Sequence, residues 1–322
     1  MADKPVILVT RKLPDAVEDR LRRDYQPILN PDDRRYTADE IIEMSAKADA
    51  ILPCHTELFT ADVIARLPSN IRAIANFSVG YDHVDIDAAK AKGLIVTNTP
   101  DVLSDATAEI AILLMLGAAR RASEGERMVR AREWKDWSPT FMIGAQVTGK
   151  RFGVIGMGRV GQVAAKRARG FDMDVHYYNR KRLSADLECG ATYHQTVEDL
   201  LPHCDVVSVH CPATPQTTGL LNRERIALLP DGAIVVNTGR GGVVNDDALI
   251  EALKSGKLYA AGLDVFNGEP ENIHPEYLEL ENVFLLPHVG SATRETRDAM
   301  GFRALDNLDA IFADREPGDR VA

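Results

Sequence analysis

The feature that most constrains this chain is an alternation of short β-branched runs with longer amphipathic stretches. Such alternation is typical of parallel strands joined by crossover helices. In the first third it predicts strands at residues 6–9, 50–53, 73–77 and 94–97, and helices at 15–25, 38–47, 61–66 and 86–92. We therefore expect an α/β fold built on doubly wound parallel sheets.

The alternation restarts after Lys150. Six further strands are predicted at 152–155, 174–178, 206–210, 233–237, 260–264 and 283–286, enough for one complete dinucleotide-binding domain. Two helical patterns flank this set. The first, 104–119, is apolar almost all round, with Ser104 or Asp105 as its N-cap, and predicts a buried helix at a domain or subunit interface. The last, 293–312, must pack on an existing domain.

Composition excludes several classes of partner. A formal net charge of -10 disfavours nucleic acid and anionic membranes, and the longest apolar run, 110–119, is too short to cross a bilayer. The four cysteines form no C-x-x-C pair, so neither a zinc site nor a disulfide framework is expected. The N-terminus lacks a signal-peptide pattern. We expect a cytoplasmic enzyme without a metal.

A glycine-rich turn directly follows the strand predicted at 152–155. Gly156, Gly158 and Gly161 form G-x-G-x-x-G, and a helical pattern starts near Val160. The first glycine permits a tight turn, the second lets a pyrophosphate approach the backbone, and the third lets helix and strand pack closely. A purely structural turn is the alternative, but the strand–turn–helix context favours dinucleotide binding.

The next strand ends without the carboxylate that usually binds the ribose of NAD. Asn179 occupies that place, followed by Arg180, Lys181 and Arg182. A carboxylate there would repel a 2′-phosphate by up to ~4 kcal/mol at about 4 Å and an effective dielectric of about 20. Asparagine removes this repulsion and the cations add attraction, which predicts NADP(H) as the preferred cofactor and leaves NAD(H) possible. A solvated basic turn is the alternative.

Three further segments each place a functional side chain just after a predicted strand, where open α/β sheets bind their ligands. They carry Arg240, Glu269 and His288. The planar fork of an arginine can hold a carboxylate and polarise a ketone. A histidine can donate a proton near neutral pH, and a neighbouring carboxylate favours its protonated form. Each residue alone has a structural alternative: an ion pair, a turn or a hydrogen-bonded loop.

Together with residues 77–85 (FSVGYDHVD) and 107–109 (TAE), these segments resemble the D-isomer-specific 2-hydroxyacid dehydrogenase family. The similarity runs from about residue 50 to the C-terminus. It implies Arg240, Glu269 and His288 as the catalytic set. It also implies two Rossmann-like or flavodoxin-like domains with an active-site cleft between them: a substrate domain of 1–100 plus 290–322, and an NAD(P)-binding domain of 101–289.

The resemblance implies further contacts. The Ser78, Val79 and Gly80 turn would bind the substrate carboxylate through backbone N–H groups, together with Arg240 and His288. Asp264 would lie near the nicotinamide amide. The remaining expected cofactor contacts are Thr107, Arg159, Val160, Pro212, Thr238, Gly239, Arg240, His288 and Gly290. Relatives also suggest a homodimer formed around 104–119.

The expected activity is reduction of a small 2-oxo acid, glyoxylate or hydroxypyruvate. Glu269 stands where formate dehydrogenases have glutamine, and no regulatory extension follows the last helix, which disfavours a phosphoglycerate dehydrogenase. Trp134, Trp137 and Phe141 match a segment that contributes bulky groups to the substrate pocket of glyoxylate/hydroxypyruvate reductases, although core or interface packing is an equal alternative. A 2-ketogluconate reductase and a dinucleotide-sensing, corepressor-like protein remain open.

Overall fold

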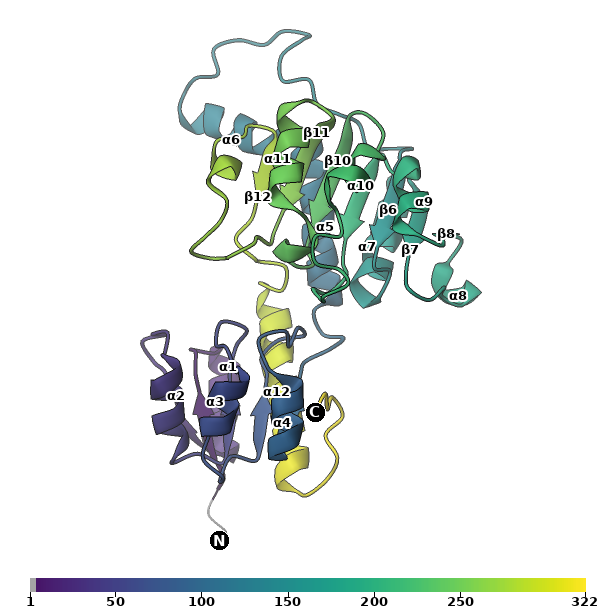
Figure 1. The fold of residues 1–322 in the computed structure, drawn as a ribbon. Helices are drawn as coiled ribbons and strands as arrows, with labels where there is room; N and C mark the ends of the chain where they lie inside the picture. Colours follow the sequence, from purple (N-terminus) through teal and green to yellow (C-terminus); the bar gives the residue numbers. More distant parts are fainter. Residues whose placement is uncertain (1–3) are drawn as a thin grey trace. The chain divides into compact units, whose positions relative to one another are not determined.

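The computed structural model describes residues 4–322, which form two compact units. The N-terminal unit comprises residues 4–103 together with Ala292–Ala322, so the end of the chain returns to the first domain (Figure 1). The second unit is the continuous segment Ser104–Ser291.

The N-terminal unit is a five-stranded parallel sheet with strand order β2-β1-β3-β4-β5. Its strands are β1 (Val6–Val9), β2 (Gln26–Ile28), β3 (Ala50–Leu52), β4 (Ala73–Ala75) and β5 (Ile95–Thr97). Its helices are α1 (Asp15–Asp24), α2 (Ala38–Ser45), α3 (Ala61–Arg66), α4 (Ile86–Lys92) and α12 (Arg294–Phe312). This is the flavodoxin-like order.

Both faces of this sheet are covered, which is why the inner strands β1, β3 and β4 are continuously apolar. Ile7 and Val9 pack with α1 and α12 on one face, and Leu8 packs with α2, α3 and α4 on the other. The edge strand β2 was not predicted, because it is three residues long and contains Pro27, which removes one backbone donor.

The second unit is a seven-stranded parallel sheet with the order β12-β11-β10-β9-β6-β7-β8. Its strands are β6 (Arg151–Ile155), β7 (Asp174–Tyr178), β8 (Thr192–His194), β9 (Val206–Val209), β10 (Ala233–Asn237), β11 (Leu258–Leu263) and β12 (Val283–Leu285). Its helices are α5 (Ser104–Ala119), α6 (Ala122–Arg130), α7 (Arg159–Arg169), α8 (Ala185–Glu188), α9 (Val197–Leu200), α10 (Arg223–Ala227) and α11 (Asp246–Lys254), with 3-10 turns η1 (Leu201–His203), η2 (Gly241–Val243) and η3 (Pro275–Leu278).

Helices cover this second sheet on both faces (Figure 1). The α5 and α7 helices pack on one face, and α9, α10 and α11 on the other. Because β6 is flanked by β7 on one side and β9 on the other, the order of connection reverses between β6 and β9. Ligands of open α/β sheets bind at the carboxyl ends of strands at this switch point.

Several details differ from the predictions. The short edge strand β8 makes seven strands rather than six. Helix α5 begins at Ser104, so Ser104 and Asp105 lie in its first turn rather than before it. The helix is not buried all round, since Leu113 is 45% exposed. Trp134, Trp137 and Phe141 are also exposed, so core packing within this chain is wrong for them.

All four cysteines are free thiols. Across residues 4–322, no helix has both the length and the apolar character needed to cross a membrane. Within the same residues, no group of three or more histidine, cysteine, aspartate or glutamate side chains is arranged to hold a metal ion.

Candidate active site

The glycine-rich turn after β6 has no space for a side chain at Gly156 or Gly161. Gly156 has a φ of 92°, and a Cβ there would lie 2.8 Å from the backbone nitrogen of Cys211, which follows β9. A Cβ on Gly161 would lie 2.5 Å from the carbonyl oxygen of Gly156. Helix α7 starts at Arg159, directly after the N-cap Gly158. The turn, Arg159 and Val160 therefore present a helix N-terminus at the switch point, which fits a diphosphate.

Asn179, directly after β7, holds this turn in place through two hydrogen bonds. Its Oδ1 accepts a hydrogen bond from the backbone N–H of Met157 at 2.7 Å, and its Nδ2 donates to the Met157 carbonyl at 3.3 Å. The asparagine thus holds the phosphate-binding turn with both ends of its amide. Sequence reasoning gave Asn179 an electrostatic role and missed this structural one.

The three cations that follow Asn179 are not equivalent. Arg182 bonds to the Glu188 carboxylate at 2.7 Å and lies over the ring of Tyr193. Arg180 and Lys181 are exposed and form no ion pair within residues 4–322. Two of the three cations are therefore available to an anionic ligand.

His288 and Glu269 form a charge-assisted pair. The His288 Nδ1 atom lies 2.5 Å from the Glu269 Oε1 atom, and both side chains are partly buried. The other carboxylate oxygen of Glu269 accepts a hydrogen bond from the backbone N–H of Phe266 at 2.8 Å. This second bond orients the carboxylate, which in turn fixes the imidazole ring.

Asp264 anchors the loop that carries His288. Its two carboxylate oxygens accept hydrogen bonds from the backbone N–H groups of Val289 and Gly290, both at 2.8 Å, and its carbonyl accepts one from His288 N–H at 2.9 Å. His288 has a φ of 52°, an unfavourable conformation for a residue with a Cβ. Burial raises the pKa of Asp264, while the two N–H donors oppose that shift.

The loop after β10 places Arg240 beside the loop after β11. A Cβ on Gly241 would lie 2.0 Å from the carbonyl carbon of Phe266, so the two backbones are in direct contact. The Arg240 carbonyl accepts a hydrogen bond from Asn237 Nδ2 at 3.0 Å. Since β10, β11 and β12 are adjacent, Arg240, Glu269 and His288 all follow neighbouring strands at one sheet edge.

Other predicted cofactor residues gather at the same edge. Thr107 Oγ1 donates to the Gly290 carbonyl at 3.1 Å, and the backbone of Gly290 also binds Asp264. Pro212 follows Cys211, and a Cβ on Gly239 would lie 2.8 Å from the Cys211 carbonyl oxygen.

Sequence reasoning missed His210, which was counted as the end of a strand. Its Nδ1 bonds to Thr238 Oγ1 at 2.9 Å and its Nε2 to Ser208 Oγ at 2.8 Å. Burial lowers its pKa to about 4, so the ring stays neutral at pH 7 and holds Thr238 in place. A histidine ending a largely apolar strand was the available signal.

The predicted substrate turn lies in the N-terminal unit, directly after β4. Each of its carbonyl groups already accepts a hydrogen bond: Ser78 from Thr99 N–H at 2.9 Å, Val79 from Asn98 Nδ2 at 2.8 Å, and Gly80 from Ser78 Oγ at 2.7 Å. The backbone N–H groups of the three residues bond to no acceptor within residues 4–322. The turn therefore offers donors, which suits an anion.

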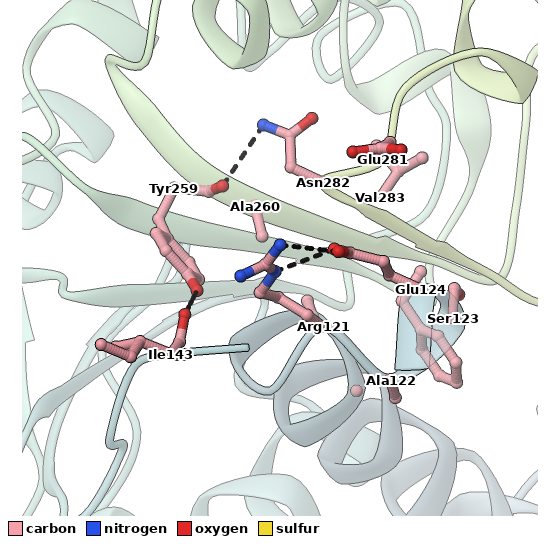
Figure 2. A pocket seen from close by; sticks show the side chains of 13 residues that line it. Arg121, Ala122, Ser123, Glu124, Ile143, Tyr259, Ala260, Glu281, Asn282 and Val283 are labelled. Carbon is pink, nitrogen blue, oxygen red and sulfur yellow. Dashed lines mark hydrogen bonds and ion pairs between the residues drawn. The ribbon is translucent and has the colours of Figure 1, made fainter. Parts of the chain in front are cut away.

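A cavity of about 230 Å³ in the second unit contains none of these predicted residues. It is lined by α5 and α6 and by the start of β11 and β12, including Arg121, Glu124 and Tyr259 (Figure 2). Arg121 pairs with Glu124 at 2.7 Å. Because this cavity lies at the amino ends of the strands, it is separate from the dinucleotide turn and the His288 loop.

A dinucleotide turn and an acid-paired imidazole on one doubly wound sheet are features of a dinucleotide-dependent oxidoreductase. Residues 112–290 match the family model described as "D-isomer specific 2-hydroxyacid dehydrogenase, NAD binding domain". The chain is 45% identical over 311 residues to glycerate dehydrogenase of Hyphomicrobium methylovorum, covering 96% of both chains. It is 40% identical to glyoxylate reductase of Pyrococcus furiosus over 313 residues, covering 96% of this chain and 92% of the relative.

Solved structures agree with these sequence matches. An NADPH-dependent glyoxylate/hydroxypyruvate reductase from Sinorhizobium meliloti, in complex with NADP and malonate, is 33% identical with a TM-score of 0.87. The match covers 99% of this chain and 97% of that structure. The chain therefore belongs to the D-isomer specific 2-hydroxyacid dehydrogenase family, as the motifs indicated, and is an NAD(P)-dependent enzyme.

We predict that His210 makes the enzyme sensitive to acid. Its folded-state pKa of about 4 lies below the ordinary value of 6.5, so only the unfolded chain takes up a proton between these values. Stability is therefore lost as the pH falls from 6.5 to 4, by ~3 kcal/mol in total for this group. Urea unfolding at pH 7 and pH 4.5 should show a smaller loss for His210→Gln than for the parent. The exposed His55→Gln is the control, and equal losses in all three proteins would contradict the assignment.

Proposed function

We propose that this chain is an NADP(H)-preferring reductase of glyoxylate or hydroxypyruvate, with His288 as the proton donor. The observation that carries the proposal is the 2.5 Å contact between the side chains of His288 and Glu269. His288 lies on a loop that hydrogen bonds to Asp264 hold in place. A bound nicotinamide cofactor would supply the hydride, held by the turn at Gly156–Gly161 and the residues around it.

Each catalytic side chain has one task in this proposal. His288 donates a proton to the substrate oxygen, and the Glu269 carboxylate stabilises the imidazolium that acts as the donor. Arg240 polarises the keto group through its guanidinium. The donors of the Ser78–Gly80 turn hold the substrate carboxylate. Asp264, Thr107 and Gly290 keep the loop of His288 in place.

The choice of substrate rests on the relatives. Reduction of the keto group of hydroxypyruvate gives glycerate, so a glycerate dehydrogenase and a hydroxypyruvate reductase share one reaction in opposite directions. Relatives named glycerate dehydrogenase and glyoxylate reductase each match this chain over 96% of its length. These names favour glyoxylate and hydroxypyruvate over the larger 2-ketogluconate, and they disfavour a sensor without turnover.

We predict that NADPH oxidation is faster with glyoxylate or hydroxypyruvate than with pyruvate or 2-ketogluconate. We also predict that His288→Ala lowers kcat by at least about 100-fold, because the substitution removes the general acid. Absorbance at saturating substrate measures both effects, and the exposed His203→Ala is the matched control. Near-normal turnover of His288→Ala would contradict the assignment of His288 as the proton donor. A parent enzyme that is inactive with all four acids would overturn the proposed function.

The preference for NADP(H) rests on the groups after β7. A carboxylate is missing at Asn179, and Arg180 and Lys181 have no ion pair within residues 4–322. The 2′-phosphate of NADP(H) would meet cations here instead of a repelling charge.

We predict a higher kcat/KM with NADPH than with NADH. Asn179→Asp keeps the acceptor for the Met157 N–H but adds a negative charge, and should lower kcat/KM for NADPH about tenfold or more. Arg180→Gln should lower it about fivefold while leaving NADH nearly unchanged. Lys166→Gln, which removes an exposed charge from α7, is the control. A parent enzyme that prefers NADH would contradict this part of the proposal.

A homodimer is the assembly that we propose. Six of the eleven exposed large apolar side chains of residues 4–322 lie between positions 113 and 143, namely Leu113, Val129, Trp134, Trp137, Phe141 and Ile143. Ile143 also lines the cavity of Figure 2 and a neighbouring hollow beside Phe141. Exposed apolar side chains concentrated in one segment favour an interface with another protein chain.

We predict a dimeric mass by light scattering at micromolar concentration. Ile143→Glu, which places a charge in the apolar surface, should shift the mass toward the monomer. Leu278→Glu changes a side chain that is 71% exposed elsewhere in the same unit and should leave the mass unchanged. A monomeric parent protein would contradict the dimer.

A further inference from the structure

The Asp246 carboxylate makes two hydrogen bonds that helix α11 does not need. Asp246 is the first residue of α11, and the N-cap Asn245 already accepts a hydrogen bond from the backbone N–H of Ala248 at 2.9 Å. The Asp246 side chain instead accepts hydrogen bonds from Asn267 Nδ2 at 2.7 Å and from the Tyr277 hydroxyl at 2.9 Å. Both donors lie between β11 and β12. The carboxylate therefore joins the start of α11 to this separate segment of the second unit.

Asn267 lies two residues before Glu269 and holds the loop after β11 against the segment that follows β10. Besides the bond to Asp246, its Nδ2 donates to the Val244 carbonyl at 3.4 Å. A Cβ on Gly242 would lie 3.3 Å from the Asn267 Oδ1 atom, so the amide packs directly on the turn η2. These contacts of Asn267 therefore fix the backbone just before Glu269.

Tyr277 gives Asp246 a second connection to Glu269. The Tyr277 ring is buried and packs against Phe266, with 6.3 Å between the ring centroids. The backbone N–H of Phe266 in turn donates to Glu269 Oε2 at 2.8 Å. Burial, and next the Asp246 carboxylate, raise the pKa of Tyr277, so its hydroxyl keeps the proton that it donates to Asp246. Two routes of contact therefore lead from Asp246 to the carboxylate that meets His288.

We propose that Asp246 is a positioning residue for the pair formed by Glu269 and His288, and that it acts mainly through Asn267. The inference rests on the proposed function in one respect, the role of His288 as the proton donor. The 2.5 Å contact depends on the placement of both partners, and a carboxylate that moves away stabilises an imidazolium less. Asp246 takes no part in the proton transfer itself, but keeps the Glu269 carboxylate at contact distance.

The expected consequence is a change in the pH dependence of the reduction. Only the imidazolium form of a histidine can donate the proton, so the rate falls as the pH rises and the ring becomes neutral. A carboxylate at contact distance favours the protonated form of an imidazole. Loosening Asn267 therefore moves the alkaline limb of the kcat/KM profile to lower pH. A smaller fraction of folded enzyme would instead lower the profile at every pH without moving it.

The test measures kcat/KM for glyoxylate with NADPH from pH 6 to pH 10. Glu269→Gln removes the partner of the imidazole and should lower the alkaline midpoint by about one pH unit. Asp246→Asn leaves one oxygen for two donors and should lower the midpoint by about 0.5 pH unit, because part of the contact is lost. Asn267→Ala changes no charge and should lower it by a similar amount. Identical midpoints in the parent, Asp246→Asn and Asn267→Ala would overturn the inference.

Asp247→Asn is the matched control. Asp247 is the next residue of the same helical turn, and its side chain is 83% exposed. This variant removes the same charge without removing a hydrogen bond to Asn267, so its midpoint should match that of the parent. A shift as large as that of Asp246→Asn would show that charge alone is responsible, which would also overturn the inference. If Asp246→Asn does not fold, Asn267→Ala carries the comparison.

A double variant and a measurement without turnover complete the test. Asp246→Asn combined with Asn267→Ala should shift the midpoint no further than Asp246→Asn alone, because both substitutions break one contact. The sum of the two single shifts would overturn the route through Asn267. An NMR titration of the His288 ring, with its signal assigned by its absence in His288→Gln, should show the same order of midpoints. A parent that reduces no 2-oxo acid but shows this order would overturn the proposed function and support the positioning role of Asp246.

Discussion

The buried carboxylate of Asp264 holds the loop of His288, and the proposed catalytic geometry depends on this interaction. It directly follows β11 and accepts hydrogen bonds from two backbone N–H groups of the loop after β12, so a single side chain joins the ends of adjacent strands. The left-handed conformation of His288 costs free energy that these bonds offset. Glu269 can then meet the imidazole because its own loop is fixed by the Phe266 N–H. Without the hydrogen bonds to Asp264, the loop that carries His288, the proposed proton donor, would lose two of its anchors.

Local pairing of charges, rather than the net charge of -10, decides where anions can bind in this chain. Glu188 takes up the charge of Arg182, and Asp319 that of Arg303. Within residues 4–322, no ion pair neutralises the charges of Arg180, Lys181 and Arg297. An unpaired cation beside oriented N–H donors attracts anions even on an acidic protein, since fields at a site are set by neighbouring groups.

Periodicity predicted most of the fold, including the strand ends that Arg240, Glu269 and His288 follow. The strands at Val6–Val9, Asp174–Tyr178 and Ala233–Asn237 match the predicted bounds, because buried parallel strands are rich in apolar and β-branched or aromatic residues. The edge strands β2 and β8 escaped prediction, since they are short and only half buried. Arg240, Glu269 and His288 could be chosen because each follows a strand. A supporting partner such as Asn98 could not, since its tertiary contacts alone reveal it.

The Ser78–Gly80 turn shows how backbone polarity can be selected without a charged residue in the turn. A peptide turn exposes both carbonyl oxygens and N–H groups, and would bind either sign of charge. Thr99 N–H, Asn98 Nδ2 and Ser78 Oγ each occupy one carbonyl, which leaves the donors without competition. Asn98 is itself buried and its carbonyl accepts a bond from Asn307 of α12, the helix that carries Arg297. Helix α12 therefore supports the polarity of the turn, because Asn307 holds the asparagine that occupies the Val79 carbonyl.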